Sequence, residues 1–263
     1  MLNDKVNQLL RSVKKNSTNV LQKTIHKSVN FKYNSVNLLI GRRGSGKTYN
    51  VFREILKLGF IPHNYSQFIY VSDKANDSTF ENVREIFPIP FDRVRYDEAL
   101  DFLKKIHMAK DDLFYLSEEG VTDADMLEEQ SREEILGVLK LNDLKNSDVH
   151  TLVLFDDCIN LFNKPNKENK ELFRMLFENR QPRITYFLAL QDTTGIGTQI
   201  KQNIDSLFFF GGFSRLKFSH MFSQISTDVD KEDLWRGYMT LTKREALIFS
   251  FDDDGTKINI LRN

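Results

Sequence analysis

Eight residues from Gly41 to Thr48 read G-R-R-G-S-G-K-T and could bind the phosphates of a nucleotide. They fit the pattern G-x-x-x-x-G-K-[ST], the P-loop, in which glycines let backbone N–H groups turn toward phosphate oxygens. In this pattern Lys47 reaches the β- and γ-phosphates, and the hydroxyl of Thr48 binds Mg²⁺. The residues predicted to contact nucleotide are Gly41, Arg42, Arg43, Gly44, Ser45, Gly46, Lys47, Thr48 and Tyr49.

The segments on either side of this octet have the patterns that a P-loop requires. Residues 36–40 (VNLLI) form a short apolar run, which is typical of a buried strand. Residues 49–58 place apolar side chains at helical spacing, and Gly59 can end that helix. Strand, loop and helix together favour a true phosphate-binding loop over an accidental glycine-rich turn.

Two acidic residues, Asp156 and Asp157, follow the most strand-like run of the chain, residues 151–155 (TLVLF). Asp156 stands where an aspartate could bind Mg²⁺, and Asp157 where a carboxylate could polarise water for attack on the γ-phosphate. Alternatively, these two carboxylates cap the following loop and take no part in catalysis. The next residue, Cys158, is expected to serve packing rather than chemistry.

Another buried strand is predicted at residues 184–190 (ITYFLAL), and it ends in Gln191. Because neighbouring parallel strands end at the same edge of a sheet, Gln191 could sense the γ-phosphate or position water. A simple turn residue is the alternative. Arg180 and Arg183 precede this strand, and an arginine at a subunit boundary could stabilise transition-state charge on a neighbour's triphosphate. Surface solvation is the alternative for both arginines.

Composition limits the class of protein. The 263 residues include 37 Lys and Arg against 37 Asp and Glu, so no overall field attracts nucleic acid. A single cysteine excludes an internal disulfide and suits a reducing compartment. No apolar run reaches membrane-spanning length, and the N-terminus lacks the apolar region of a signal peptide. We therefore expect an intracellular protein with no membrane insertion.

Charge is unevenly distributed along the chain. Residues 1–35 carry seven Lys and Arg against one acid, and this basic extension could contact nucleic acid or an acidic partner, or simply be solvated. Between Asp97 and His150 the acids outnumber Lys and Arg by fifteen to six. We interpret residues 97–150 as an acidic helical insertion, with residues 108–149 on the surface, in a domain that spans residues 36–263.

Alternating strand-like and helix-like segments predict an α/β fold with a mostly parallel sheet flanked by helices. Two apolar runs near the end of the chain, joined by an Asp-Gly turn, predict a C-terminal β-hairpin. Further strands are predicted at residues 67–72, 93–96 and 206–210, and helices at residues 78–87, 169–179 and 196–204.

The order of these motifs resembles the FtsK–HerA superfamily of DNA-pumping ATPases, and within it the poxvirus-type genome-packaging ATPases of large DNA viruses and virophages. The resemblance spans about residues 36 to 210 and rests on G-R-R-G-S-G-K-T, L-V-L-F-D-D, Y-F-L-A-L-Q-D and I-K-Q-N-I-D-S-L-F-F-F. Where that family often has Arg-His before the strand, this chain has Arg180-Gln181-Pro182-Arg183. Either arginine could therefore be the arginine finger.

The resemblance implies a P-loop NTPase fold of the RecA-like (ASCE) type and hydrolysis of ATP with Mg²⁺. It assigns catalytic roles to Lys47, Asp157, Gln191 and Arg180, and Mg²⁺ to Thr48 and Asp156. Residues 163–166 (N-K-P-N) lack the final Asp of a guanine-reading motif, which argues against a GTPase.

The resemblance also implies partners. It predicts a homo-oligomeric ring, pentameric or hexameric, that pulls double-stranded DNA into a preformed capsid. A capsid or virion protein would be its partner, and the host cytoplasm, a viral factory or the virion its location. Two other functions stay open: an ATP-dependent switch or scaffold that recruits a partner, and a helicase or conjugation-type DNA pump.

Overall fold

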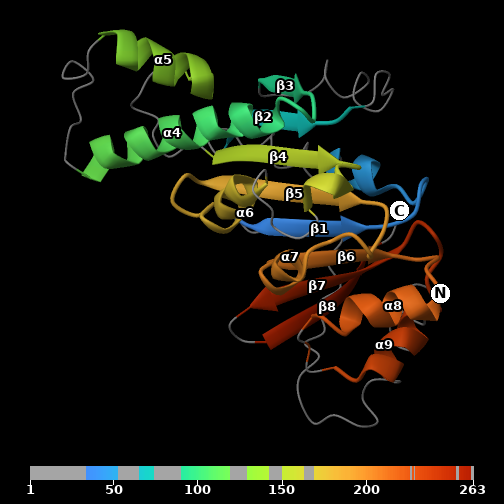
Figure 1. Ribbon diagram of the computed structural model, residues 1–263. Helices are drawn as coiled ribbons and strands as arrows, with labels where there is room; N and C mark the ends of the chain where they lie inside the picture. Colours follow the sequence, from blue (N-terminus) through green and yellow to red (C-terminus); the bar gives the residue numbers. More distant parts are fainter. Residues whose placement is uncertain are drawn as a thin grey trace.

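The computed structural model describes residues 34–52, 65–73, 90–118, 129–141, 150–162, 169–225, 227, 229–252 and 255–261. The predicted helix at residues 78–87 lies outside these residues, as does the predicted N-terminal extension apart from its last two positions. Eight strands of the described chain form one sheet in the order β3-β2-β4-β5-β1-β6-β7-β8 (Figure 1). They are β1 (Val36–Ile40), β2 (Tyr65–Val71), β3 (Phe91–Val94), β4 (His150–Asp156), β5 (Ile184–Leu190), β6 (Ser206–Phe210), β7 (Ala246–Asp252) and β8 (Gly255–Leu261).

The strands β1 to β6 pair in parallel, whereas β7 and β8 add to β6 as an antiparallel hairpin. In the centre of the sheet, Ile40 lies opposite Leu190, and Asp156 lies opposite Ala189. The carboxyl ends of β1, β4 and β5 therefore meet at one edge. Both the predicted parallel sheet and the predicted C-terminal hairpin are confirmed.

Helices cover both faces of the sheet. They are α4 (Ala99–Glu118), α5 (Glu129–Leu139), α6 (Lys170–Phe177), α7 (Thr198–Gln202), α8 (Arg215–Phe222) and α9 (Lys231–Tyr238), and residues 47–52 are also helical. Successive residues of a strand point to opposite faces. Leu38 accordingly belongs to the apolar cluster that includes side chains of α4, α6, α8 and α9, whereas Leu39 belongs to the cluster that includes Phe52. No helix in the described ranges is long and apolar enough to cross a membrane.

The acidic insertion contains α4 and α5, as predicted, but its placement on the surface was wrong. Leu103, Ile106 and Leu113 of α4 are buried in the main core, and Leu139 of α5 joins them. These α4 side chains recur at helical spacing, so one face of α4 packs on the sheet while the acids occupy the other positions. The insertion therefore contributes to the core of the domain.

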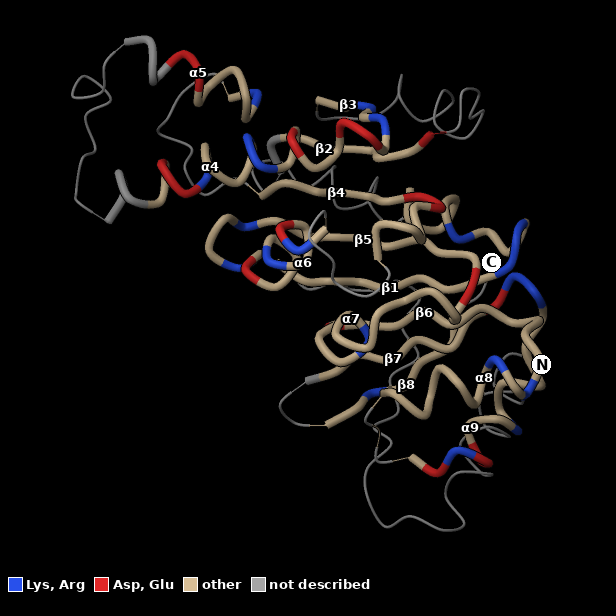
Figure 2. Tube along the Cα trace, in the orientation of Figure 1, with Lys and Arg blue, Asp and Glu red and all other residues tan. Residues whose placement is uncertain are grey.

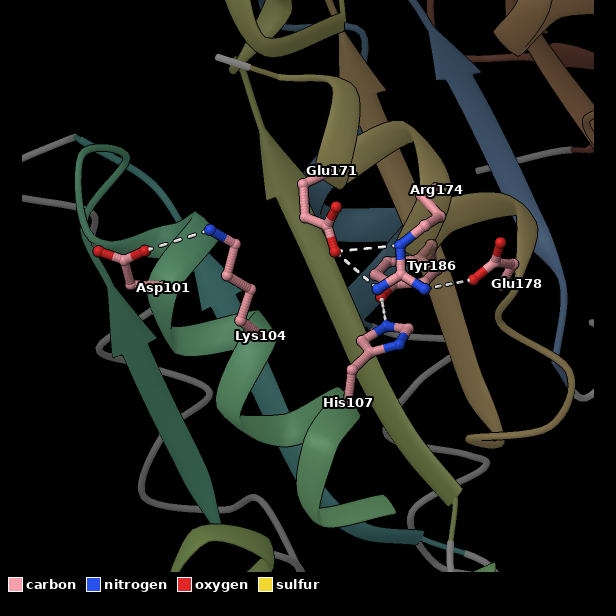
Figure 3. Close-up of polar contacts among 7 residues, drawn as sticks. All are labelled: Asp101, Lys104, His107, Glu171, Arg174, Glu178 and Tyr186. Atoms are coloured by element: carbon pink, nitrogen blue, oxygen red, sulfur yellow. Dashed lines mark hydrogen bonds and ion pairs between the residues drawn. The ribbon is translucent and has the colours of Figure 1, made fainter. Parts of the chain in front are cut away.

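A buried polar pair anchors α4 to the centre of the sheet. His107 Nε2 lies 2.7 Å from the hydroxyl of Tyr186 in β5. Figure 3 shows this pair beside Arg174 of α6, whose guanidinium is held by Glu171 and Glu178. Burial lowers the pKa of His107 to about 4, with the charges of Arg174 and Lys110 acting in the same direction. His107 is therefore neutral in the folded protein at neutral pH.

We expect the free energy of unfolding to fall as the pH drops from about 6.5 toward 4. The folded-state pKa of His107 lies below its unfolded value, so in this window the unfolded chain binds more protons. His107 contributes roughly 1–3 kcal/mol to the free energy of unfolding. This contribution is fully present above pH 6.5 and is lost at about pH 4. Urea unfolding of the wild type and of His107→Gln at several pH values would measure it. An equal pH dependence in the two proteins would contradict the assignment.

Candidate nucleotide-binding site

The loop that joins β1 to the following helix has a backbone that requires glycine. Gly44 and Gly46 have φ angles of 74° and 88°, in the left-handed region that other residues seldom adopt. A Cβ atom added to Gly41 would lie 2.4 Å from Ser45 Oγ and 2.9 Å from the Cβ of Phe210. The loop can fold back on itself only because these positions lack side chains. This is the tight turn that the sequence pattern predicts.

The helix that follows the loop carries two polar side chains at its first turn. Lys47 is buried, and its ammonium donates a hydrogen bond to the carbonyl of Gly41 at 2.7 Å. The hydroxyl of Thr48 donates to Asp156 Oδ1 at 2.9 Å, although 108 positions separate these two residues in the chain. The structure thus brings the P-loop and the first aspartate of the Asp156-Asp157 pair into direct contact.

Asp156 is the last residue of β4, and its carboxylate is held at both oxygens. Only 2% of Asp156 is exposed. Its Oδ1 accepts from Thr48, and its Oδ2 accepts from the hydroxyl of Tyr70 at 3.0 Å. Tyr70 comes from β2, the neighbour of β4. Tyr70 could not be identified from the sequence, because only the order of the strands brings it to Asp156.

We expect Tyr70→Phe to raise the Mg²⁺ concentration needed for half-maximal ATP hydrolysis by about tenfold, since partners that orient a metal ligand have effects of this size. The change removes one hydroxyl and keeps the ring that packs against Phe52. Tyr186→Phe is the matched control, because it deletes a buried hydroxyl beside His107 instead. Equal Mg²⁺ requirements in Tyr70→Phe and the wild type would contradict the role of Tyr70.

Asp157 and Gln191 form a second polar pair at the same edge. Asp157 has a φ of 61°, a strained conformation for a residue other than glycine, and its backbone N–H donates to the carbonyl of Ala189 at 2.9 Å. Gln191 Nε2 donates to Asp157 Oδ2 at 2.6 Å. Gln191 is exposed and Asp157 is half-buried. A carboxylate and an amide therefore stand together within reach of solvent, which is the arrangement that activates and orients a water molecule.

Cys158 is buried next to this pair, and its thiol is unreactive. Burial raises the pKa of its thiol to about 12, and the charge of Asp156 acts in the same direction. The thiol therefore stays protonated and is a poor nucleophile. This agrees with the expectation that Cys158 serves packing.

The remaining predicted residues are dispersed. Tyr49 is 60% exposed, Arg43 is exposed, and the guanidinium of Arg42 lies 5.8 Å from the ring centroid of Phe213. Arg180 precedes β5 and so lies at the opposite edge of the sheet, about 20 Å from Gln191 at ordinary strand rise. The structure does not bring Arg180 to the other predicted residues of the same chain, and its role as a finger stays a prediction about a neighbouring subunit.

The residues at this edge fit a magnesium–triphosphate complex. Mg²⁺ prefers oxygen ligands, uses few protein side chains and shares phosphate oxygens with its nucleotide. Thr48 Oγ1 and the Asp156 carboxylate supply such oxygens next to a glycine loop that leaves room for phosphates. With Lys47 in the same turn, the donor set is the one that a P-loop nucleotide site requires.

Comparisons with known proteins bear on the fold. No protein-family model matches the sequence, and neither does any curated protein. Among solved structures, the DNA-packaging ATPase B204 from Sulfolobus Turreted Icosahedral Virus is 14% identical with a TM-score of 0.55, over 86% of this chain and 96% of that one. The genome packaging NTPase B204 from Sulfolobus turreted icosahedral virus 2, in complex with ATP-gammaS, is 15% identical with a TM-score of 0.53, over 86% and 96% of the two chains.

A bacterial ATPase is similar as well. ATPases 2 and 3 of EssC from Geobacillus thermodenitrificans are 14% identical with a TM-score of 0.54, over 86% of this chain and 40% of that one. At sequence identities this low, the structural similarity is evidence for a shared fold and not for a shared activity. The chain therefore has the α/β fold of the P-loop NTPases, with a mostly parallel sheet, a helical insertion and a C-terminal hairpin.

Proposed function

We propose that this chain is the ATP-hydrolysing subunit of a motor of the FtsK–HerA type that packages double-stranded DNA into a viral capsid. The observation that carries the proposal is the hydrogen bond from Thr48 to Asp156, with Asp157 and Gln191 beside it. This chain shares its fold with 96% of the length of B204, a DNA-packaging ATPase, and this similarity supports the same function for this chain. The poxvirus-type motifs of the sequence point in the same direction.

The proposed reaction assigns one task to each side chain. Lys47 and the loop N–H groups would bind the β- and γ-phosphates, and Thr48 and Asp156 would hold Mg²⁺, which neutralises charge on those phosphates. Asp157 would accept a proton from the attacking water, whose oxygen bonds to the γ-phosphorus as ADP leaves. Gln191, hydrogen-bonded to Asp157, would orient that water.

A ring of five or six subunits would complete the site. Arg180 is exposed and lies at the amino edge of β5, far from the P-loop of its own chain. It could stabilise transition-state charge only on the nucleotide of a neighbour, where such arginines have large effects. Arg183, three residues later, is half-buried, so Arg180 is the better candidate.

The DNA-binding surface is proposed from charge. Two cations that follow the central strands already have acidic partners, since Arg215 pairs with Glu232 and Lys217 pairs with Asp192 at 2.5 Å. Figure 2 shows Lys and Arg stretches along the carboxyl edge of the sheet. With the basic residues 1–35 they are the remaining candidates for DNA phosphates. A capsid protein would be the other partner, in the host cytoplasm, a viral factory or the virion.

The test is made on the purified chain with and without a non-hydrolysable ATP analogue. We expect mass measurement to detect a ring in the presence of the analogue. We expect double-stranded DNA to raise the rate of ATP hydrolysis, and ATP to drive displacement of the third strand from a DNA triplex. An assembled ring that hydrolyses ATP at the same rate with and without DNA would overturn the packaging function and favour a nucleotide-dependent switch.

A further inference from the structure

A lysine from the distant C-terminal part of the chain lies against the P-loop. A Cβ atom built on Gly44 would lie 3.4 Å from the Nζ atom of Lys243, which belongs to the segment between α9 and β7. Gly44 stands in the left-handed region and presents bare backbone at this point. The ammonium of Lys243 therefore lies directly beside the P-loop.

The segment that carries Lys243 is a turn with its own hydrogen bonds. The N–H of Glu245 donates to the carbonyl of Thr242 at 3.1 Å, and the N–H of Thr242 donates to the Glu245 carboxylate at 2.8 Å. Lys243 and Arg244 occupy the tip between them. The N–H of Gly211 donates to the carbonyl of Glu245 at 2.9 Å, which ties the turn to the end of β6.

Two glycines after β6 let this turn come close. A Cβ atom on Gly211 would lie 2.3 Å from the carbonyl oxygen of Thr242, a separation that no side chain allows. Gly212 has a φ of 99°, and a Cβ atom there would lie 3.9 Å from Cγ of Lys243. Glycine is thus required on the β6 side, and the stem of Lys243 lies between Gly212 and the P-loop.

Buried packing around Tyr238 holds the end of α9, from which the chain continues into the turn, against the end of β6. The hydroxyl of Tyr238, at the end of α9, donates to the carbonyl of Phe210 and accepts from the N–H of Phe213, each at 2.8 Å. Tyr238 is 2% exposed, and its ring centroid lies 5.2 Å from that of Phe209. The N–H of Leu241 donates to the carbonyl of Tyr238 at 3.0 Å, so this packing holds the chain just before the turn that carries Lys243.

Lys243 differs from Arg215 and Lys217 in its partners. No ion pair within the described residues involves Lys243, whereas Arg215 and Lys217 are both paired with acids. Lys243 is also exposed. A lysine ammonium is a compact charge with three donors, well suited to phosphate oxygens. Its distance from Gly44 favours the bound nucleotide over DNA as the source of those oxygens.

We propose that Lys243 is a second phosphate-binding lysine, which contacts the polyphosphate of the nucleotide held by the P-loop. The inference rests on the proposed function, because it requires that a nucleotide binds there. Lys243 would supplement Lys47 from outside the loop, and it would couple the C-terminal part of the fold to the presence of the β- and γ-phosphates.

Calorimetric titration of the full chain tests the proposal, with Mg²⁺ and either a non-hydrolysable ATP analogue, ADP or AMP. We expect Lys243→Ala to weaken binding of the analogue and of ADP by about tenfold, the usual size for a hydrogen bond to a charged group. AMP, which lacks both distal phosphates, should bind Lys243→Ala and the wild type equally. Lys243→Arg should keep most of the affinity, and Lys231→Ala, an exposed lysine of α9, is the matched control.

The outcomes separate the two proposals. A wild type that binds no nucleotide overturns the proposed function, and the inference with it. A wild type that binds the analogue no more tightly than Lys243→Ala overturns the inference alone. Loss of affinity for double-stranded DNA with unchanged nucleotide affinity would make Lys243 a DNA contact, and would overturn the inference as well.

Discussion

Replacing Lys47 with alanine is expected to lower the rate of ATP hydrolysis by about 100-fold or more, the usual cost of removing one group that stabilises transition-state charge. Lys47 is buried at the start of the helix, and its ammonium lies 2.7 Å from the carbonyl of Gly41. No other cation of the loop is buried in this way, since Arg42 and Arg43 are exposed. The lost charge therefore has no substitute within the loop.

Phosphate release at saturating ATP measures the effect. Lys47→Met is the companion variant, because it keeps an apolar stem of similar length in the buried position and removes only the charge. Lys231→Ala, on α9, should hydrolyse ATP like the wild type. Thermal unfolding of each variant shows whether the fold is kept. Hydrolysis by folded Lys47→Met at the wild-type rate would mean that the P-loop does not carry the reaction.

Asp157→Asn is expected to reduce kcat by about 100- to 10,000-fold, as loss of a general base does, while ATP binding changes little. The asparagine side chain has the same shape, and its oxygen can still accept the hydrogen bond that Gln191 donates at 2.6 Å to the native carboxylate. What it cannot do at neutral pH is accept a proton from water. A loss in kcat with no loss in affinity is the pattern for a group that acts in the transition state.

Single-turnover hydrolysis and titration with a non-hydrolysable ATP analogue separate these two effects. Asp230→Asn is the matched control, since Asp230 caps α9 and asparagine caps helices about as well. If Asp157→Asn hydrolyses ATP like the wild type, the base lies elsewhere. If it loses affinity and rate together, Asp157 helps to bind the nucleotide instead.

The sequence predicted the sheet well because its central strands are buried on both faces. Residues 151–155 and 184–190 are apolar apart from one threonine each, and every residue of β5 is buried. The motif at Gly41 and the polar ends of these runs then predicted which residues gather at one edge. Thr48 does contact Asp156, and Gln191 contacts Asp157. Their catalytic roles stay predictions.

Other parts of the site could not be predicted from the sequence, because they depend on contacts between distant segments. Tyr70 reaches Asp156 only because β2 lies next to β4. Lys243 reaches Gly44 only because glycines at the end of β6 admit the turn before β7. Short motifs carry no information about either contact.

The helices α8 and α9 were missed for a local reason. In α8, Leu216 is 80% exposed, whereas Phe218 is buried only two positions later. Phe218, Met221 and Phe222 are buried at helical spacing, but Leu216 falls outside this stripe and weakens the pattern in so short a segment. In α4 the helical spacing of Leu100, Leu103 and Ile106 is visible in the sequence, but the many acids after them favoured a surface position for the rest of the insertion.

In the proposed ring, the strand β5 has a consequence for communication between subunits. It lies in the centre of the sheet, all seven of its residues are buried, and it runs from just after Arg180 to just before Gln191. Close-packed interiors transmit displacement because they cannot absorb it. A shift of Gln191 when the γ-phosphate departs should therefore move the far end of the same strand like the other end of a stiff rod. Hydrolysis of ATP in one subunit would then be transmitted mechanically to the next subunit, with no need for a separate signalling element.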